Sequence, residues 1–151
     1  MTALNKACEE SLVDYLISTV DTSSFADGTV INYYTGIGNV STLTAPAVFV
    51  CADSGHSVYH NSNVYELMVK VSVKEMAADT NSGSLGILAH RVFNSFWDPN
   101  RVGKINSGSM TNWNFACWHV EQLDLAHSTL EDAMINEMLV KVVGTLSGSN
   151  S

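Results

Sequence analysis

Two pairs of side chains in this sequence have a spacing that could support chemistry, and the first is a pair of histidines. His56 and His60 lie four residues apart, and Asp53 precedes them. On a helix this spacing would place both imidazoles on one face, as zinc sites require. The glycine, serine and asparagine residues around them favour a polar loop over residues 55–63 instead. We therefore interpret the histidines as exposed loop residues and expect no metal or other cofactor.

The second pair is Cys117 and His119, which flank Trp118. Residues two apart on a strand share a face, so a thiol and an imidazole could form a nucleophile and its base. The local sequence FACWHV is more typical of a core strand with a small buried cysteine. No nucleophile-elbow motif lies nearby. Gly36-Ile37-Gly38 lacks the third glycine and the following helix of a dinucleotide-binding loop. We expect no catalytic residues and a protein that is not an enzyme.

Charge excludes ordinary nucleic-acid binding. The 151 residues carry a net charge of −8 with only seven lysines and arginines, too few to neutralise many phosphates. Such a chain could still surround DNA without gripping it, because a negative wall repels a polyanion. Charged residues make up 15% of the chain, and neutral Ser, Thr and Asn supply much of its polar surface. A surface with little charge is easily desolvated, which favours assembly with other subunits.

Hydrophobic periodicity predicts two helices and about five strands. The first helix has an apolar stripe that includes Cys8, Leu12 and Leu16, with Glu9 off the stripe. A further loop or turn is expected from His127 to Asp132. The helices are predicted at Ala3 to Thr19 and Ser84 to Trp97, and the strands at Thr29 to Thr35, residues 47–53, Val64 to Glu75, Asn112 to Leu123 and Ile135 to Leu146.

The strand from Val64 to Glu75 has the clearest alternation. It predicts one buried side and one solvent-facing side, the latter with Glu66, Met68, Lys70, Ser72 and Lys74. Because this strand is unusually long, we expect that it could project from the sheet and pair with a neighbouring subunit. The early connections are too short for βαβ units. The expected fold class is α+β, with an antiparallel or mixed sheet covered by two helices.

Residues 1–146 are expected to form a single domain, followed by a flexible tail over residues 147–151. The first residues do not resemble a signal peptide, and no apolar run has the length of a membrane helix. The three cysteines show no CxxC pair and are expected to be reduced and buried.

The order of these segments and their patterns of apolar and polar residues resemble those of the tail-terminator or neck proteins, also called head-tail joining proteins, of long-tailed phages. The matching segments cover about residues 3–146: the helix with SLVDYL, the strand PAVFVCAD, the strand VYELMVKVSV, the helix LGILAHRVFNSFW and the final strand MLVKVVGTL. The resemblance implies a virion protein, assembled in the host cytoplasm, that forms a hexameric ring at the head-proximal end of the tail tube. Its implied partners are further copies of itself, the tube protein, a head-side connector and DNA that passes through the ring without specific binding.

Assembly contacts are expected on the long strand, on the second helix with the basic loop behind it, and at the acidic connection before the last strand. Trp97, beside a proline turn, is the tryptophan expected to be partly exposed and to serve as an interface anchor. The candidate interface residues are Tyr65, Met68, Lys70, Arg91, Trp97, Arg101, Lys104, Glu131 and Asp132. Three alternatives stay open: another phage head- or tail-completion protein, a small ligand-binding or enzymatic domain, and a cytoplasmic adaptor that forms no ring.

Overall fold

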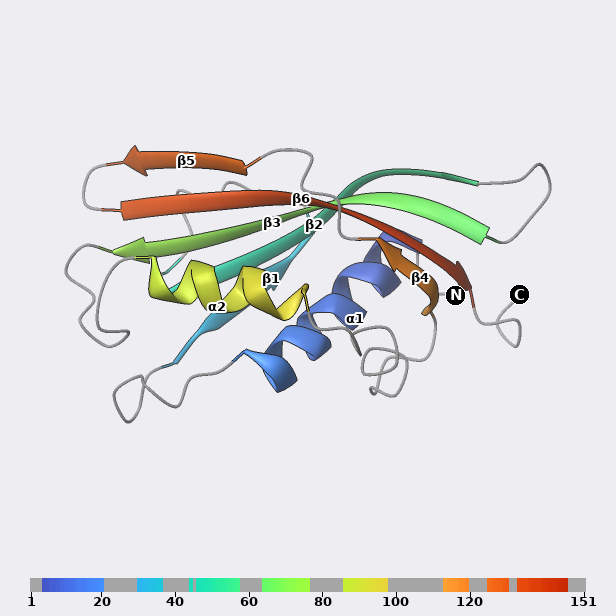
Figure 1. Cartoon of the computed structure of the whole chain (residues 1–151), viewed down its shortest axis with the longest axis horizontal. Helices are drawn as coiled ribbons and strands as arrows, with labels where there is room; N and C mark the ends of the chain where they lie inside the picture. The colour runs from blue at the N-terminus through green and yellow to red at the C-terminus, as the bar shows by residue number, and fades with distance from the viewer. Residues whose placement is uncertain are drawn as a thin grey trace.

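A mixed β-sheet and two helices make up the fold of the chain in a computed structural model (Figure 1). The structure describes residues 4–20, 30–36, 44, 46–57, 64–76, 86–97, 113–119, 125–130 and 133–146. The elements in chain order are α1 (Leu4–Thr19), β1 (Asn32–Thr35), β2 (Ala47–Ser57), β3 (Val64–Met76), α2 (Ile87–Ser95), β4 (Trp113–His119), β5 (Leu125–Leu130) and β6 (Ala133–Leu146).

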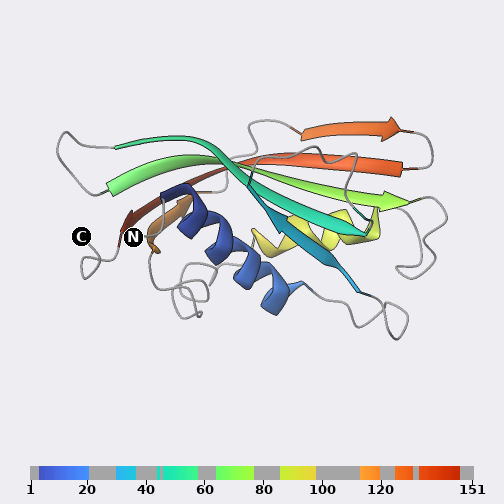
Figure 2. The same ribbon diagram turned by 180° about the vertical axis from the view of Figure 1, so that it is seen from behind.

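The strands run in the order β1-β2-β3-β6-β4, and β5 pairs with β6 beside β4. β1 and β2 are parallel, and every other pair is antiparallel. β3 pairs along one edge of β6. Along the other edge of β6, β5 pairs with residues 133–138 and β4 pairs with residues 141–146. Figure 2 shows β5 at the upper margin of the sheet and β1 at the lower margin. The α+β class, with a mixed sheet and two helices, is confirmed.

Two segments predicted as loops are strands. Leu125–Leu130 forms β5, although it was assigned to a connection, and it pairs with Ala133–Met138 of β6. Its sequence LAHSTL has little alternation, so pairing with β6, rather than intrinsic preference, makes it a strand. β2 continues through Gly55 to Ser57, where a polar loop was predicted, because it stays paired with β3 beyond a register shift between Ala52 and Ser54. His56 therefore lies on a strand.

β3 lies inside the sheet, so the expectation that it could pair with a neighbouring subunit is wrong. β2 pairs with β3 from Tyr65 to Lys74, and β6 pairs with it from Val64 to Met76. Backbone groups along both edges of β3 are thus used within the chain. Its length is explained by β6, which matches it residue for residue, rather than by projection from the sheet.

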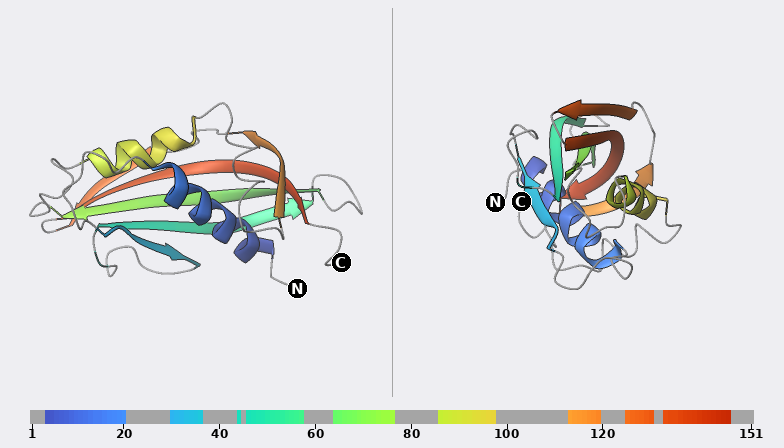
Figure 3. Two further views of the ribbon diagram at one scale, coloured as in Figure 1. Left: turned by 90° about the horizontal axis from the view of Figure 1, so that it is seen from below. Right: turned by 90° about the vertical axis from the view of Figure 1, so that its left-hand side faces the viewer.

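The core lies between the helices and one face of the sheet. Register places Val50, Val71 and Met138 in one row of that face, and all three are buried. The end-on view in Figure 3 shows both helices on the same side of the curved sheet. Figure 1 shows α1 crossing the strands obliquely and α2 running along them. Neither described helix is long and apolar enough to cross a membrane.

Helix α1 follows the predicted stripe, with Cys8, Leu12 and Leu16 fully buried. Burial of each leucine contributes roughly 1.5–3 kcal/mol. Glu9, which the periodicity placed off the stripe, is buried too, and that expectation is wrong. Its carboxylate accepts a hydrogen bond of 2.8 Å from the backbone N–H of Ala52. Ala52 lies two residues beyond Val50, the last residue of β2 that pairs with β1, and Glu9 reaches its amide from the helix.

Helix α2 begins after Gly86, whose φ of 93° is a left-handed conformation that glycine adopts easily. Leu88 and Val92 are its most buried side chains, and Phe96, the C-cap residue that follows the helix, is buried too. Glu75, at the end of β3, accepts hydrogen bonds from the backbone N–H groups of Gly86 (3.0 Å) and Leu88 (3.2 Å). A buried carboxylate of the sheet therefore caps the first turn of the helix, where backbone donors lack partners.

Candidate assembly surface

The sheet face opposite the helices, here called the outer face, carries a cluster of paired charges. On β3 it consists of Glu66, Met68, Lys70, Ser72 and Lys74, and on β6 of Ile135, Glu137, Leu139, Lys141 and Val143. We call Glu66, Lys70, Glu137 and Lys141 the charge ladder. Each of the four side chains is partly exposed.

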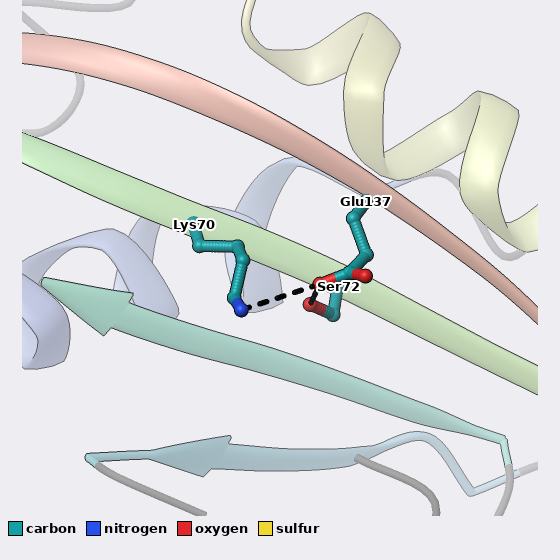
Figure 4. Close-up of polar contacts among 3 residues, drawn as sticks. All are labelled: Lys70, Ser72 and Glu137. Atoms are coloured by element: carbon teal, nitrogen blue, oxygen red, sulfur yellow. Dashed lines mark hydrogen bonds and ion pairs between the residues drawn. The ribbon is translucent and has the colours of Figure 1, made fainter. Parts of the chain in front are cut away.

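Glu137 is the centre of one half of the ladder (Figure 4). The Nζ of Lys70 lies 3.5 Å from its Oε2, and the hydroxyl of Ser72 donates a hydrogen bond of 3.1 Å to the same oxygen. Ser72 lies directly opposite Glu137 in the register, whereas Lys70 lies opposite Leu139. The Lys70 contact is therefore a diagonal one, which long side chains on adjacent strands can make.

Glu66 and Lys141 form the other half in the same way. Their charged atoms lie 3.8 Å apart, and the register again makes the contact diagonal, because Lys141 lies opposite Met68. Pairs as exposed as these contribute about 0–1 kcal/mol each to stability. Their larger effect is on surface charge: two lysines and two glutamates make this part of the face neutral. In a chain with a net charge of −8, a neutral patch is where a second acidic surface meets least repulsion.

The other end of the outer face is buried within the chain, which corrects the prediction of a solvent-facing side along all of β3. Ser72 and Lys74 are buried, as are Phe49 opposite Ser72 and Ile135 opposite Lys74. The alternation of polar and apolar residues could not show this, because the apolar neighbours belong to other strands. Among the described side chains of β3 and β6, the exposed part of this face consists of the charge ladder and the half-buried apolar residues between its members, Met68, Leu139 and Val143.

Trp97 is exposed, as its position beside the proline turn predicted, with 52% of its surface accessible. The turn that carries it is tied to α1. The hydroxyl of Tyr15 donates to the carbonyl oxygen of Ser95, and the rings of Tyr15 and Phe96 meet edge to face with centroids 6.4 Å apart. The N–H of Trp97 donates to the carbonyl of Asn94 at 3.0 Å. A large aromatic side chain on a fixed turn can bind a partner with little loss of conformational entropy.

The candidate interface residues do not form one surface. Met68 and Lys70 lie on the outer face, whereas Tyr65 lies on the helix side and packs against the core. Arg91 is half-buried on α2, the helix that precedes the turn of Trp97. Arg101, Lys104, Glu131 and Asp132 lie outside the described residues. The basic loop and the acidic connection therefore remain predictions.

The residues considered for chemistry are placed only in part. His56 pairs in register with Glu66, and His60 lies outside the described residues. Cys117 and His119 lie on β4, opposite Val143 and Lys141, and the structure does not describe their side chains. Within the described part of the chain, no three His, Cys, Asp or Glu side chains come together as metal ligands would.

Two described cysteines, Cys8 and Cys51, are buried, and neither forms a disulfide bond. Burial raises the pKa of the Cys8 thiol far above its ordinary value, and the nearby charge of Glu9 raises it further. A thiol held in its protonated form is a poor nucleophile, so Cys8 acts as a core residue.

Sequence reasoning missed the partners that make the site. It placed Lys70 and Ser72 on one side of a strand but did not connect them with Glu137. The signal was present in part, since both β3 and β6 alternate and each places a lysine and a glutamate on one side. Only the register between strands separated by more than fifty residues shows which charges meet.

A scan against protein-family models and a search of curated proteins found no match for this chain.

Proposed function

We propose that this protein is a non-enzymatic structural subunit that assembles into a ring at the head-proximal end of a phage tail tube. In this role it ends polymerisation of the tube and joins the tail to a head-side connector, with DNA passing through the ring. The proposal rests on the resemblance to tail-terminator and neck proteins. The observation that supports it best is the charge ladder, a neutral and partly exposed patch on a strongly acidic chain.

Neutrality matters because every copy in a ring carries the same charge. Two chains with a net charge of −8 repel each other over about 8 Å at physiological ionic strength. Contacts between them are therefore best made where charges are already paired or absent. The charge ladder meets this condition, and its half-buried apolar residues add surface that can be removed from water.

Trp97 provides a second contact point on the helix side of the molecule. Hot spots of protein interfaces are enriched in tryptophan, and the turn of Trp97 is fixed by Tyr15. A subunit of a terminating ring needs two binding surfaces, one for its neighbours in the ring and one for the tube or the connector. The outer face and the turn of Trp97 are separate surfaces that suit this division.

The acidic chain also suits a DNA conduit. Seven basic residues are too few for strong phosphate binding, so DNA inside such a ring would remain free to slide. We expect no specific DNA contact and no cofactor. The final location would be the neck of the virion, after assembly in the host cytoplasm.

The test is termination of tube growth. Purified protein is added to polymerising tube protein from the same phage, and tube lengths are measured by negative-stain electron microscopy. We expect shorter tubes with an added layer at one end, and Trp97→Ala or an outer-face variant should lose this effect. Tubes of unchanged length with bare ends, at a saturating concentration of the folded wild-type protein, would refute the proposal.

A further inference from the structure

Charge is distributed unevenly across the strands of the sheet. The three inner strands carry all of its Asp, Glu, Lys and Arg residues: Asp53 on β2, Glu66, Lys70, Lys74 and Glu75 on β3, and Glu137 and Lys141 on β6. The strands at the margins, β1, β4 and β5, have none. Natural sheets usually show the opposite pattern, because charge on an edge strand, above all lysine, prevents it from pairing with another chain.

The margin at β1 is suited to accept another strand. Its N–H at Asn32 donates to the carbonyl of Pro46 at 3.0 Å, toward β2. Because backbone groups alternate along a strand, the N–H groups of Tyr33 and Thr35 point away from β2, toward the other edge of β1. Among the described residues, no strand other than β2 pairs with β1.

The residues before β1 extend this edge. Val30 is 68% exposed, and residues 30–35 read VINYYT, a run of β-branched, aromatic and neutral polar residues. Such uncharged segments with high strand preference pair readily with other strands. The run has the same length as β5, which spans six residues at the opposite margin.

We propose that β1 of one copy pairs with β5 of a second copy, so that the sheet continues from subunit to subunit. This inference rests on the proposed ring and places a backbone contact between its copies at the sheet margins, in addition to the surfaces proposed above. The second copy approaches an acidic chain most easily at an uncharged margin. Two different margins that bind each other form a head-to-tail interface, the kind that generates rings when the rotation closes. We choose β5 over β4 because Figure 1 shows β5 away from both helices, so that one of the two paired margins is clear of them; α1 packs against β4 and also against β1.

Lysine substitutions at the two margins test the pairing. Thr35→Lys blocks β1, Ser128→Lys blocks β5, and Asn94→Lys adds the same charge at an exposed position on α2. Thr35→Pro is a second variant of the β1 margin, which removes an outward N–H without adding charge. Each full-length variant is measured by native mass spectrometry, after far-UV circular dichroism and thermal unfolding have shown that it folds.

We expect the wild type and Asn94→Lys to form the same oligomer, and the three margin variants to be monomers. Mixing Thr35→Lys with Ser128→Lys should then give dimers and nothing larger, because each pair retains one intact β1 and one intact β5. Dimers in the mixture distinguish β1–β5 pairing from pairing of two identical margins, in which one of the two lysine variants would keep the wild-type oligomer.

Failure of the pairing and failure of the ring give different results. If the wild type forms a ring and the folded Thr35→Lys and Ser128→Lys variants both form the same ring, the proposed pairing is wrong but ring formation is not. A wild-type dimer that both variants dissociate would support the pairing and overturn the ring. A wild type that is monomeric at every concentration, alone and with tube protein, would overturn both.

Discussion

Replacing Glu75 perturbs the attachment of α2 to the sheet. The carboxylate of Glu75 is fully buried and accepts hydrogen bonds from the N–H groups of Gly86 and Leu88. Glu75→Ala removes both acceptors and leaves two backbone donors at the start of the helix without a partner. Glu75→Gln keeps the shape and one acceptor oxygen but removes the charge.

The expected loss follows from the burial of the two donors. An unsatisfied buried donor costs about 1–3 kcal/mol, and the hydrogen bond to Leu88 is buried while that to Gly86 is only partly so. We therefore expect Glu75→Ala to lower the free energy of unfolding by about 3 kcal/mol. Glu75→Gln should lower it by roughly 1–2 kcal/mol, since one acceptor is retained. In a domain of this size, the alanine variant should melt about 6–12 °C below the wild type.

Urea unfolding followed by circular dichroism measures these differences, with Glu10→Gln as the matched control. Glu10 forms an exposed pair with Lys6 on the surface of α1, so its replacement should change the free energy of unfolding by less than about 0.5 kcal/mol. If Glu75→Ala stays within about 0.5 kcal/mol of the wild type, the carboxylate is not the cap of α2. If Glu10→Gln lowers the free energy of unfolding as much as Glu75→Gln does, the destabilisation does not depend on the position and burial of the carboxylate.

Three further perturbations test other parts of the structure. Burial raises the pKa of the Tyr33 phenol from 10.0 to about 12, so the unfolded chain loses this proton at lower pH than the folded chain. The free energy of unfolding should therefore fall between pH 10 and pH 12, and Tyr33→Phe should flatten this decline in urea titrations; an unchanged slope would contradict it. Trp97→Ala should change the free energy of unfolding by less than about 1 kcal/mol, because the side chain is largely exposed, but should weaken assembly; wild-type assembly in sedimentation velocity would refute its role. A double-mutant cycle of Lys70→Gln and Glu137→Gln should give a coupling of about 0.2–1 kcal/mol that decreases with salt, and a coupling above about 2 kcal/mol would mean that the pair is shielded from solvent.

The helices and the central strands could be predicted from the sequence because their periodicity is local. Leu12 and Leu16 on α1, and Leu67 and Val71 on β3, repeat with the period of their own element and are buried as expected. β5 was missed because LAHSTL forms a strand only through its pairing with β6. The position of β3 inside the sheet was missed for the same reason, since strand length alone does not reveal which edges are occupied.

The candidate surface could be predicted only in part. Exposure of Trp97 followed from the proline turn beside it, which is a local signal. The charge ladder depends on the register of β3 against β6. This register cannot be inferred from residues that are close together in the sequence. Glu9 and Glu75 read as surface or strand-end carboxylates, yet each accepts hydrogen bonds from backbone amides of a distant element. Buried carboxylates of this kind can be recognised only when the fold shows which backbone amides donate hydrogen bonds to them.

The most direct test of ring formation is the mass of the native assembly. Native mass spectrometry of the wild-type protein, alone and in the presence of tube protein, counts the copies of the 16.3 kDa chain in one complex. Ring formation predicts a single closed species, with six copies as the resemblance implies. A protein that remains monomeric under both conditions, or that forms a broad series of masses without a closed species, would contradict it.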